Sequence, residues 1–323
     1  MSSNDTRPIA GVFPVLPTPF AADKQSDRAA LQVLVRYLLR CGVDGMTFPG
    51  VASEVSELTE DERLSLTQLV LLEVAGRVPV VVGVSSNKPA VTIALAKAAA
   101  DIGAAAVMVA APAAFTTAAA QVSHFTALAA AVPGLPIMLQ NVPPPVGAGL
   151  APEVVAEILH AVPAIRYVKE ETLPSGQRLS VIRQLAPGSL VGVLGGAGGR
   201  YITDELRRGA IGTMPAIELA EVHVALFKAH RAGEAARARQ LFTRMLPILN
   251  IQAVFRWALT KYVLHRRGLI SDTSQRIAGP RLDVLDQQDV EAFLVDIHDL
   301  LLPQAALDQC HSAPGSGFEG GER

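Results

Sequence analysis

The chain has 323 residues, half of them apolar, and a formal net charge of −2. This length allows one large domain or two modest ones, with enough apolar residues for a sizeable core. The near-neutral charge, without a basic patch or arginine-rich run, argues against nucleic acid as a partner, and no segment approaches the ~20 uncharged apolar residues of a membrane span.

The cysteines and the N-terminus predict a cytoplasmic protein without a metal site. Cys41 and Cys310 are far apart in the sequence, and neither has a cysteine or histidine partner at metal-ligand spacing. The first seven residues lack the apolar core of a signal peptide.

Eight short apolar runs predict β-strands, and their nearly continuous apolar character is typical of a parallel sheet covered on both faces. The predicted strands span 12–16, 42–48, 78–84, 105–110, 135–141, 164–169, 190–194 and 210–214. Longer stretches between them predict helices over 27–41, 59–75, 88–102, 118–132, 151–161, 175–186 and 200–209. Thr59 is a candidate N-cap because Glu62 follows three residues later.

The repeated strand–helix order predicts an α/β fold, a (β/α)8 TIM barrel over residues 8–216. An open doubly wound sheet is the alternative. From residue 217 to 305 the sequence predicts a C-terminal helical extension of the same domain, with helices near 217–231, 234–248, 251–267 and 287–301. The last residues, 306–323, predict a disordered tail.

Lys169 is the most unusual residue, because it ends a predicted buried strand. The other five lysines lie in polar turns or predicted helices, where an ammonium group can stay solvated. Burial disfavours the charged form of lysine, and a neutral amine is a nucleophile toward a ketone. Lys169 is therefore a candidate Schiff-base lysine; the alternative is a strand-end lysine whose tip reaches water.

Glu171 follows Lys169 by two positions, so strand alternation turns both side chains to the same face. If that face is the barrel interior, an amine and a carboxylate meet at the C-terminal mouth, where active sites of this fold form. A glutamate there could move protons for an imine-forming lysine. A plain Lys–Glu ion pair is the structural alternative.

Three loops after predicted strands carry further candidates. The loop Gly50–Glu54 could present backbone N–H groups and Ser53 to a small anion, although the motif by itself is weak and favours an ordinary loop. Gln140 and Asn141 end the fifth strand before three prolines and could hydrogen-bond a polar substrate or simply terminate the strand. The glycine-rich loop Gly195–Gly199 lacks the acidic partner of a dinucleotide site, which favours a tight loop or a close approach to a ligand.

In this order the segments resemble the dihydrodipicolinate synthase/N-acetylneuraminate lyase superfamily, from about Gly11 to Leu300. The matching segments are Gly11–Phe20, Gly50–Glu54, Pro79–Gly83, Pro136–Pro143, Val168–Glu170 and Gly209–Met214. The resemblance implies a (β/α)8 barrel, a dimer or tetramer, and a Schiff base between Lys169 and pyruvate or another 2-oxo acid, with no separate cofactor. On this basis we assign catalysis to Lys169, Glu171 and Gln140, and substrate binding to Ser53, Ala52, Asn141, Gly195 and Thr213.

The departures from the family pattern favour one branch. Gln140 stands in place of the tyrosine that relays protons in the synthases and aldolases, and Pro144 and Pro145 replace their arginine. The 2-keto-3-deoxyarabonate dehydratase branch is similar to this chain in its glutamine, in the pair Ser53-Glu54 and in Glu171. The resemblance therefore implies dehydration of a 2-keto-3-deoxy sugar acid. A retro-aldol lyase, a synthase-like condensation, a non-catalytic 2-oxo acid binder and a nicotinamide enzyme are the alternatives.

Overall fold

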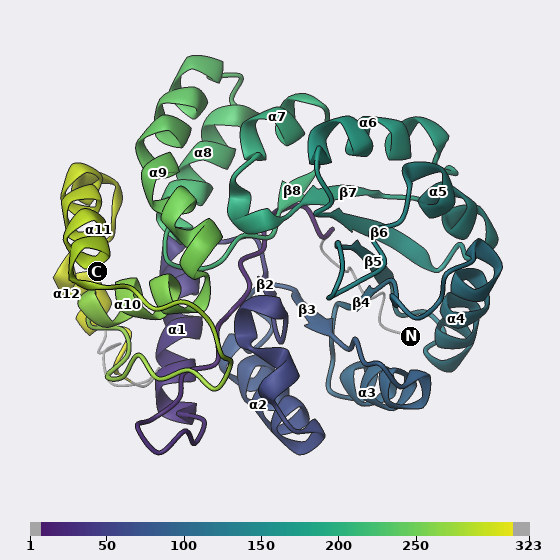
Figure 1. The fold of residues 1–323 in the computed structure, drawn as a ribbon, viewed down its shortest axis with the longest axis horizontal. Coiled ribbons are helices and arrows are strands. Elements are labelled where there is room, and N and C mark those ends of the chain that lie inside the picture. Colours follow the sequence, from purple (N-terminus) through teal and green to yellow (C-terminus); the bar gives the residue numbers. More distant parts are fainter. Residues whose placement is uncertain (1–7, 313–323) are drawn as a thin grey trace, which may run out of the picture.

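The computed structural model describes residues 8–312 and shows eight parallel strands that curve into a barrel (Figure 1). The strands are β1 (Gly11–Val12), β2 (Met46–Thr47), β3 (Val80–Gly83), β4 (Ala106–Ala110), β5 (Ile137–Asn141), β6 (Ile165–Glu170), β7 (Gly192–Gly195) and β8 (Gly212–Thr213). From β2 to β8 each strand pairs with the next one in chain order, and β1 pairs with β8.

The ring closes between β1 and β2 through a parallel bridge from Val15 to Thr47. The Leu16 amide donates to the Thr47 carbonyl at 3.0 Å, and the Thr47 amide donates to the Pro14 carbonyl at 2.9 Å. This closure confirms the barrel and excludes the open doubly wound sheet, which would leave two unpaired edges.

Eight helices alternate with the strands and cover the outside of the barrel (Figure 1). They are α1 (Arg28–Cys41), α2 (Glu60–Val74), α3 (Pro89–Asp101), α4 (Ala118–Ala131), α5 (Pro152–Ala161), α6 (Ser175–Leu185), α7 (Ile202–Arg207) and α8 (Ala220–Arg231). The predicted capping box of α2 is present: Thr59 and Glu62 bond each other's backbone N–H groups. None of the helices in residues 8–312 is long and apolar enough to cross a membrane.

The barrel interior is a packed apolar plug. Phe13, Met108, Met138, Tyr167 and Leu194 belong to this cluster and are nearly inaccessible to solvent. The larger cluster lies between the strands and the surrounding helices. The plug fills the lower part of the barrel. The next inward-facing side chains toward the carboxyl ends of the strands therefore face the open mouth of the barrel.

The C-terminal extension follows the barrel, but it begins later than predicted. α8 contacts α1 and β1, so residues 220–231 complete the outer ring of helices. The extension proper consists of α9 (Ala235–Phe255), α10 (Trp257–Arg266), α11 (Val284–Asp296) and α12 (Gln304–Asp308). Short 3₁₀ turns also occur at η1 (Val51–Ser53), η2 (Val55–Glu57), η3 (Ala197–Gly199) and η4 (His298–Leu300).

The predicted disordered tail is wrong over residues 306–312. α12 lies within that range, and Leu307 and Cys310 are buried against the core. Apolar side chains at these two positions give the segment a surface to bury. The remainder of the predicted tail, 313–323, lies outside the described residues.

One lysine departs from the expectation that all but Lys169 stay solvated. Lys261 of α10 is fully buried and bonds Glu54 at 2.5 Å, and Glu54 is also fully buried. The Glu54 carboxylate accepts two further bonds, from the amides of Arg276 and Ile277, both at 2.8 Å. This ion pair joins the loop after β2 to the extension across 207 positions of sequence, so helical periodicity alone could not reveal it.

Candidate active site

Strand β6 places Lys169 inside the barrel. Tyr167 belongs to the interior plug, whereas Val168 belongs to the outer cluster between strands and helices. Alternation along the strand therefore turns Lys169 inward, one step above Tyr167. Only 4% of Lys169 is exposed.

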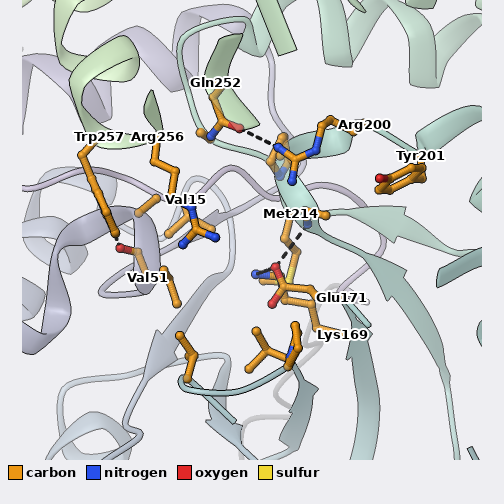
Figure 2. A pocket seen from close by; sticks show the side chains of 18 of the residues that line it. Val15, Val51, Lys169, Glu171, Arg200, Tyr201, Met214, Gln252, Arg256 and Trp257 are labelled. Atoms are coloured by element: carbon orange, nitrogen blue, oxygen red, sulfur yellow. Dashed lines mark hydrogen bonds and ion pairs between the residues drawn. The ribbon is translucent and has the colours of Figure 1, made fainter. Parts of the chain in front are cut away.

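Glu171 lies just past the end of β6, and its carboxylate meets the amine as alternation predicts. The Lys169 Nζ and the Glu171 Oε1 are 3.2 Å apart. The Gln140 Nε2 donates to Glu171 Oε2 at 2.6 Å, and the Ala197 amide donates to Oε1 at 3.2 Å. Donors from β5, β6 and the loop after β7 thus converge on one carboxylate and fix its position. Figure 2 shows Lys169 and Glu171 side by side.

These contacts set the charge state of Glu171. Burial raises the pKa of its carboxyl group, but the charge of Lys169 and the hydrogen bonds from Gln140 and Ala197 together lower this pKa below its ordinary value. Glu171 is therefore a carboxylate at neutral pH. A carboxylate beside an amine at the barrel mouth can accept and return a proton.

Gln140 and Asn141 are separated by the alternation of β5. Gln140 pairs in register with Lys169 and faces the interior, whereas Asn141 pairs with Glu170 on the outer face. Asn141 Nδ2 donates to Glu170 Oε2 at 2.8 Å, and its Oδ1 accepts from the Leu150 amide at 2.9 Å. Asn141 therefore braces the loop after β5 and does not reach the amine–carboxylate pair.

The loop after β2 borders the site with Val51 and Ala52, whereas the Ser53 hydroxyl is used within the loop. Ser53 is buried, accepts from the Gly50 amide at 2.8 Å and donates to the Leu16 carbonyl, so its hydroxyl fixes the loop. Val51 and Ala52 line the cavity instead. They open the 3₁₀ turn η1, where the first amides have no hydrogen-bond partner within the turn.

Gly195 and Thr213 pair with each other in register and do not line the cavity. A Cβ on Gly195 would lie 1.8 Å from Glu205 of α7, so this residue faces the outer helices. Thr213 is fully buried, and its neighbour Met214 belongs to the interior cluster and borders the cavity. Alternation places Thr213 on the opposite, outer face.

Lys169 and Glu171 open onto a cavity of about 300 Å³. Several of its lining residues escape sequence analysis: Arg200 and Tyr201 after η3, and Gln252, Arg256 and Trp257 at the junction of α9 and α10. The junction falls where the sequence predicts a helix over 251–267, and no local motif distinguishes it. Arg200 directly follows the glycine-rich loop, which was the only available signal.

No group of three or more His, Cys, Asp or Glu side chains in residues 8–312 is arranged to hold a metal ion. The described residues that line the cavity offer an amine, a carboxylate, two guanidinium groups, and the polar side chains of Tyr201, Gln252 and Thr260. Fold and site together define a (β/α)8-barrel protein with a buried amine–carboxylate pair at its mouth.

The chain belongs to the dihydrodipicolinate synthetase family, whose model matches residues 8–294, and it is a lyase of that family. It is 31% identical to the L-2-keto-3-deoxyarabonate dehydratase of Azospirillum brasilense, over 87% of this chain and 92% of that protein. It is 34% identical to a 4-hydroxy-tetrahydrodipicolinate synthase of Exiguobacterium sp., over 86% and 92% of the two chains.

The fold agrees with solved structures of the same family. The prophage protein YagE of E. coli K12, solved in complex with pyruvate, matches with a TM-score of 0.82 and 26% identity, over 90% of this chain and 99% of that chain. These matches confirm the family resemblance inferred from the sequence. They also confirm the similarity to a 2-keto-3-deoxyarabonate dehydratase.

Proposed function

We propose that this protein forms a Schiff base between Lys169 and a 2-oxo acid and dehydrates a 2-keto-3-deoxy sugar acid. The observation that carries the proposal is the distance of 3.2 Å between the Glu171 carboxylate and the Lys169 amine. The polar residue on the neighbouring strand β5 is Gln140, whose side chain is an amide. The similarity to a named 2-keto-3-deoxyarabonate dehydratase supports it. Assembly into a dimer or tetramer stays a prediction.

The first step is imine formation at C2. Glu171 is near enough to take a proton from the Lys169 ammonium, and the free amine then adds to the ketone carbon. Loss of water from the resulting carbinolamine gives the iminium. Val51 and Ala52 of the η1 turn line the cavity, and in this proposal their amides bind the substrate carboxylate.

The second step uses the iminium as an electron sink, so that the proton on C3 becomes acidic. C3 is adjacent to the carbon bonded to Nζ, which brings that proton near the Glu171 carboxylate. Proton transfer converts the iminium to a neutral enamine and removes the positive charge that lowers the pKa of Glu171. The carboxyl group then holds the proton and can deliver it to the departing C4 hydroxyl, which leaves as water. Hydrolysis of the remaining imine frees Lys169.

Gln140 favours elimination over carbon–carbon cleavage. A retro-aldol reaction removes the proton of the C4 hydroxyl, and an amide cannot relay that proton at ordinary pH. In the structure Gln140 instead donates to Glu171, holding the carboxylate for a proton on the neighbouring carbon. The same substitution argues against the synthase reaction named for the Exiguobacterium relative.

Borohydride trapping with pyruvate tests the imine directly. Mass mapping should find the adduct on Lys169 alone, and Lys261 is the internal control, because it is also buried but bonded to Glu54 and to the Ser274 carbonyl. An adduct elsewhere, or none with any 2-oxo acid, rejects the proposal. With 2-oxo-3-deoxy pentonates and hexonates, a dehydratase releases a product one water lighter that keeps every carbon. Release of pyruvate would instead establish the retro-aldol lyase, and binding without turnover a non-catalytic binder.

A further inference from the structure

The charges that line the cavity are unbalanced. Among the described residues, the cavity is lined by three basic side chains, Lys169, Arg200 and Arg256, and by one acidic side chain, Glu171. Lys169 and Glu171 neutralise each other, which leaves the two guanidinium groups. A substrate with a single carboxylate would offset one of these charges, and a substrate with two anionic groups would offset both.

Arg200 is held toward the cavity by an uncharged partner. Its Nη1 donates to the Gln252 Oε1 of α9 at 2.9 Å. Glu218 also acts on Arg200 electrostatically, but burial raises the pKa of this glutamate to about 7, so it is a weak counter-charge at neutral pH. Glu218 accepts from Thr260 at 3.0 Å instead.

Arg256 occupies a strained position between α9 and α10. Its φ of 41° and ψ of −107° lie outside the regions that non-glycine residues favour. Its amide donates to the Gln252 carbonyl at 2.9 Å, and its carbonyl accepts from the Thr260 amide at 3.1 Å, so both helices hold the kink. Backbone strain of this kind persists where the surrounding structure imposes it, often at ligand sites.

Trp257 ties this kink to the opposite wall. Its indole Nε1 donates to the Val51 carbonyl at 2.8 Å, in the loop expected to hold the substrate carboxylate. The Arg256 guanidinium lies 5.7 Å from the centroid of the Trp257 ring. Neither Arg256 nor Arg200 forms an ion pair with a carboxylate in residues 8–312.

We propose that Arg200 and Arg256 form a second anion subsite, which selects 2-oxo acids that carry a further anionic group at the end remote from the ketone. Figure 2 shows both side chains among the residues that line the cavity, Arg200 above the Lys169–Glu171 pair and Arg256 to its left. Arginine recognises carboxylate and phosphate oxygens by the same forked hydrogen bonds, so the distal group is one of these two. The inference rests on the proposed Schiff base at Lys169.

Pairs of 2-oxo acids that differ only at the far end test the subsite. 2-Oxoglutarate and 2-oxoadipate carry a terminal carboxylate where 2-oxopentanoate and 2-oxohexanoate end in carbon and hydrogen. The readout is the concentration that gives half-maximal borohydride trapping on Lys169. We expect at least one diacid to trap at about a tenfold lower concentration than its monoacid partner, as one charge-assisted hydrogen bond provides. No preference at either length overturns the subsite.

Two variants locate the effect. Arg200→Gln and Arg256→Gln should each reduce the diacid preference while leaving trapping by pyruvate within about twofold. Arg239→Gln removes the same charge from the exposed surface of α9 and should leave the preference intact. If pyruvate trapping weakens as much as diacid trapping, the arginines bind the C1 carboxylate and the second subsite is rejected.

The trapping data separate the two proposals. Absence of any adduct with pyruvate disproves the Schiff base, whereas adducts without a diacid preference disprove only the second subsite. A comparison of 2-oxo-3-deoxygluconate with its 6-phosphate then identifies the anion. Preference for the phosphorylated compound assigns phosphate, and preference for diacids alone assigns carboxylate.

Discussion

Replacing Glu171 by glutamine removes the proposed base and keeps the shape of its side chain. The wild-type carboxylate accepts from three groups: Lys169 at 3.2 Å, Gln140 at 2.6 Å and the Ala197 amide at 3.2 Å. A glutamine retains one acceptor oxygen, which can serve Lys169 and Ala197 together. The opposite end becomes a donor, and Gln140 can satisfy it by turning its own amide oxygen toward it.

The expected loss follows from the role of the carboxylate. A positioned general base contributes roughly 10²–10⁴ in rate, so kcat for dehydration should fall by about that factor. Loss of a charge-assisted hydrogen bond to the buried Lys169 should lower the free energy of unfolding by about 1.5–3 kcal/mol. The variant should therefore remain folded at room temperature.

The assay pairs turnover with trapping. Product formation from a 2-oxo-3-deoxy sugar acid should nearly cease in Glu171→Gln, while the final yield of borohydride adduct on Lys169 stays close to wild type. Glu157→Gln, at an exposed position of α5, is the matched control and should alter neither readout. A kcat within about fivefold of wild type would refute the assignment of Glu171. Loss of the adduct together with turnover would show that its main role lies in imine formation.

Three further perturbations test the architecture around the site. Gly196→Ala places a Cβ 2.4 Å from the Cγ of Glu171 and should lower kcat in steady-state assays. Gly188→Ala meets nothing within 4 Å and should leave kcat unchanged, so equal activities of the two variants would contradict this reasoning. Lys261→Met leaves the Glu54 carboxylate buried without its cation and should reduce the free energy of unfolding in urea by about 3–5 kcal/mol, and a loss below about 1 kcal/mol would argue against the pair as a structural link. Burial raises the pKa of Glu205 from 4.5 to about 7, so its contribution to stability is complete below about pH 4.5 and is lost as the pH rises through 7. Glu205→Gln should flatten that decline in denaturation curves measured between pH 4.5 and 8, and an unchanged slope would place the titration elsewhere.

Most of the barrel could be predicted from local sequence, because its strands are short, nearly continuous apolar runs and its helices are the longer stretches between them. The capping box of Thr59 and Glu62 located the start of α2 to the residue. The boundary of the extension was misplaced because α8 has the same amphipathic pattern whether it packs on the barrel or beyond it. Only its contacts with α1 and β1 decide between these.

In the candidate site, too, some residues could be placed from the sequence and others only from the structure. Lys169 and Glu171 share a face by strand alternation, a property of two positions, and so their meeting was predictable. Alternation applied to β5 could also have turned Asn141 away from Gln140, since neighbouring residues cannot face the same side. The outward placement of Gly195 and Thr213 follows from their register with Glu170 and Val12, which requires the paired strands to be known.

What the sequence determined by itself is therefore the order of the elements and the amine–carboxylate pair at the end of one strand. The tertiary structure decided what surrounds that pair. Arg200 and Arg256 are 56 positions apart and line one cavity because the extension folds back to the barrel mouth. Lys261 is buried because the same fold-back brings Glu54 against it. Contacts of this kind depend on how loops and helices close in space, and no periodicity along the chain encodes them.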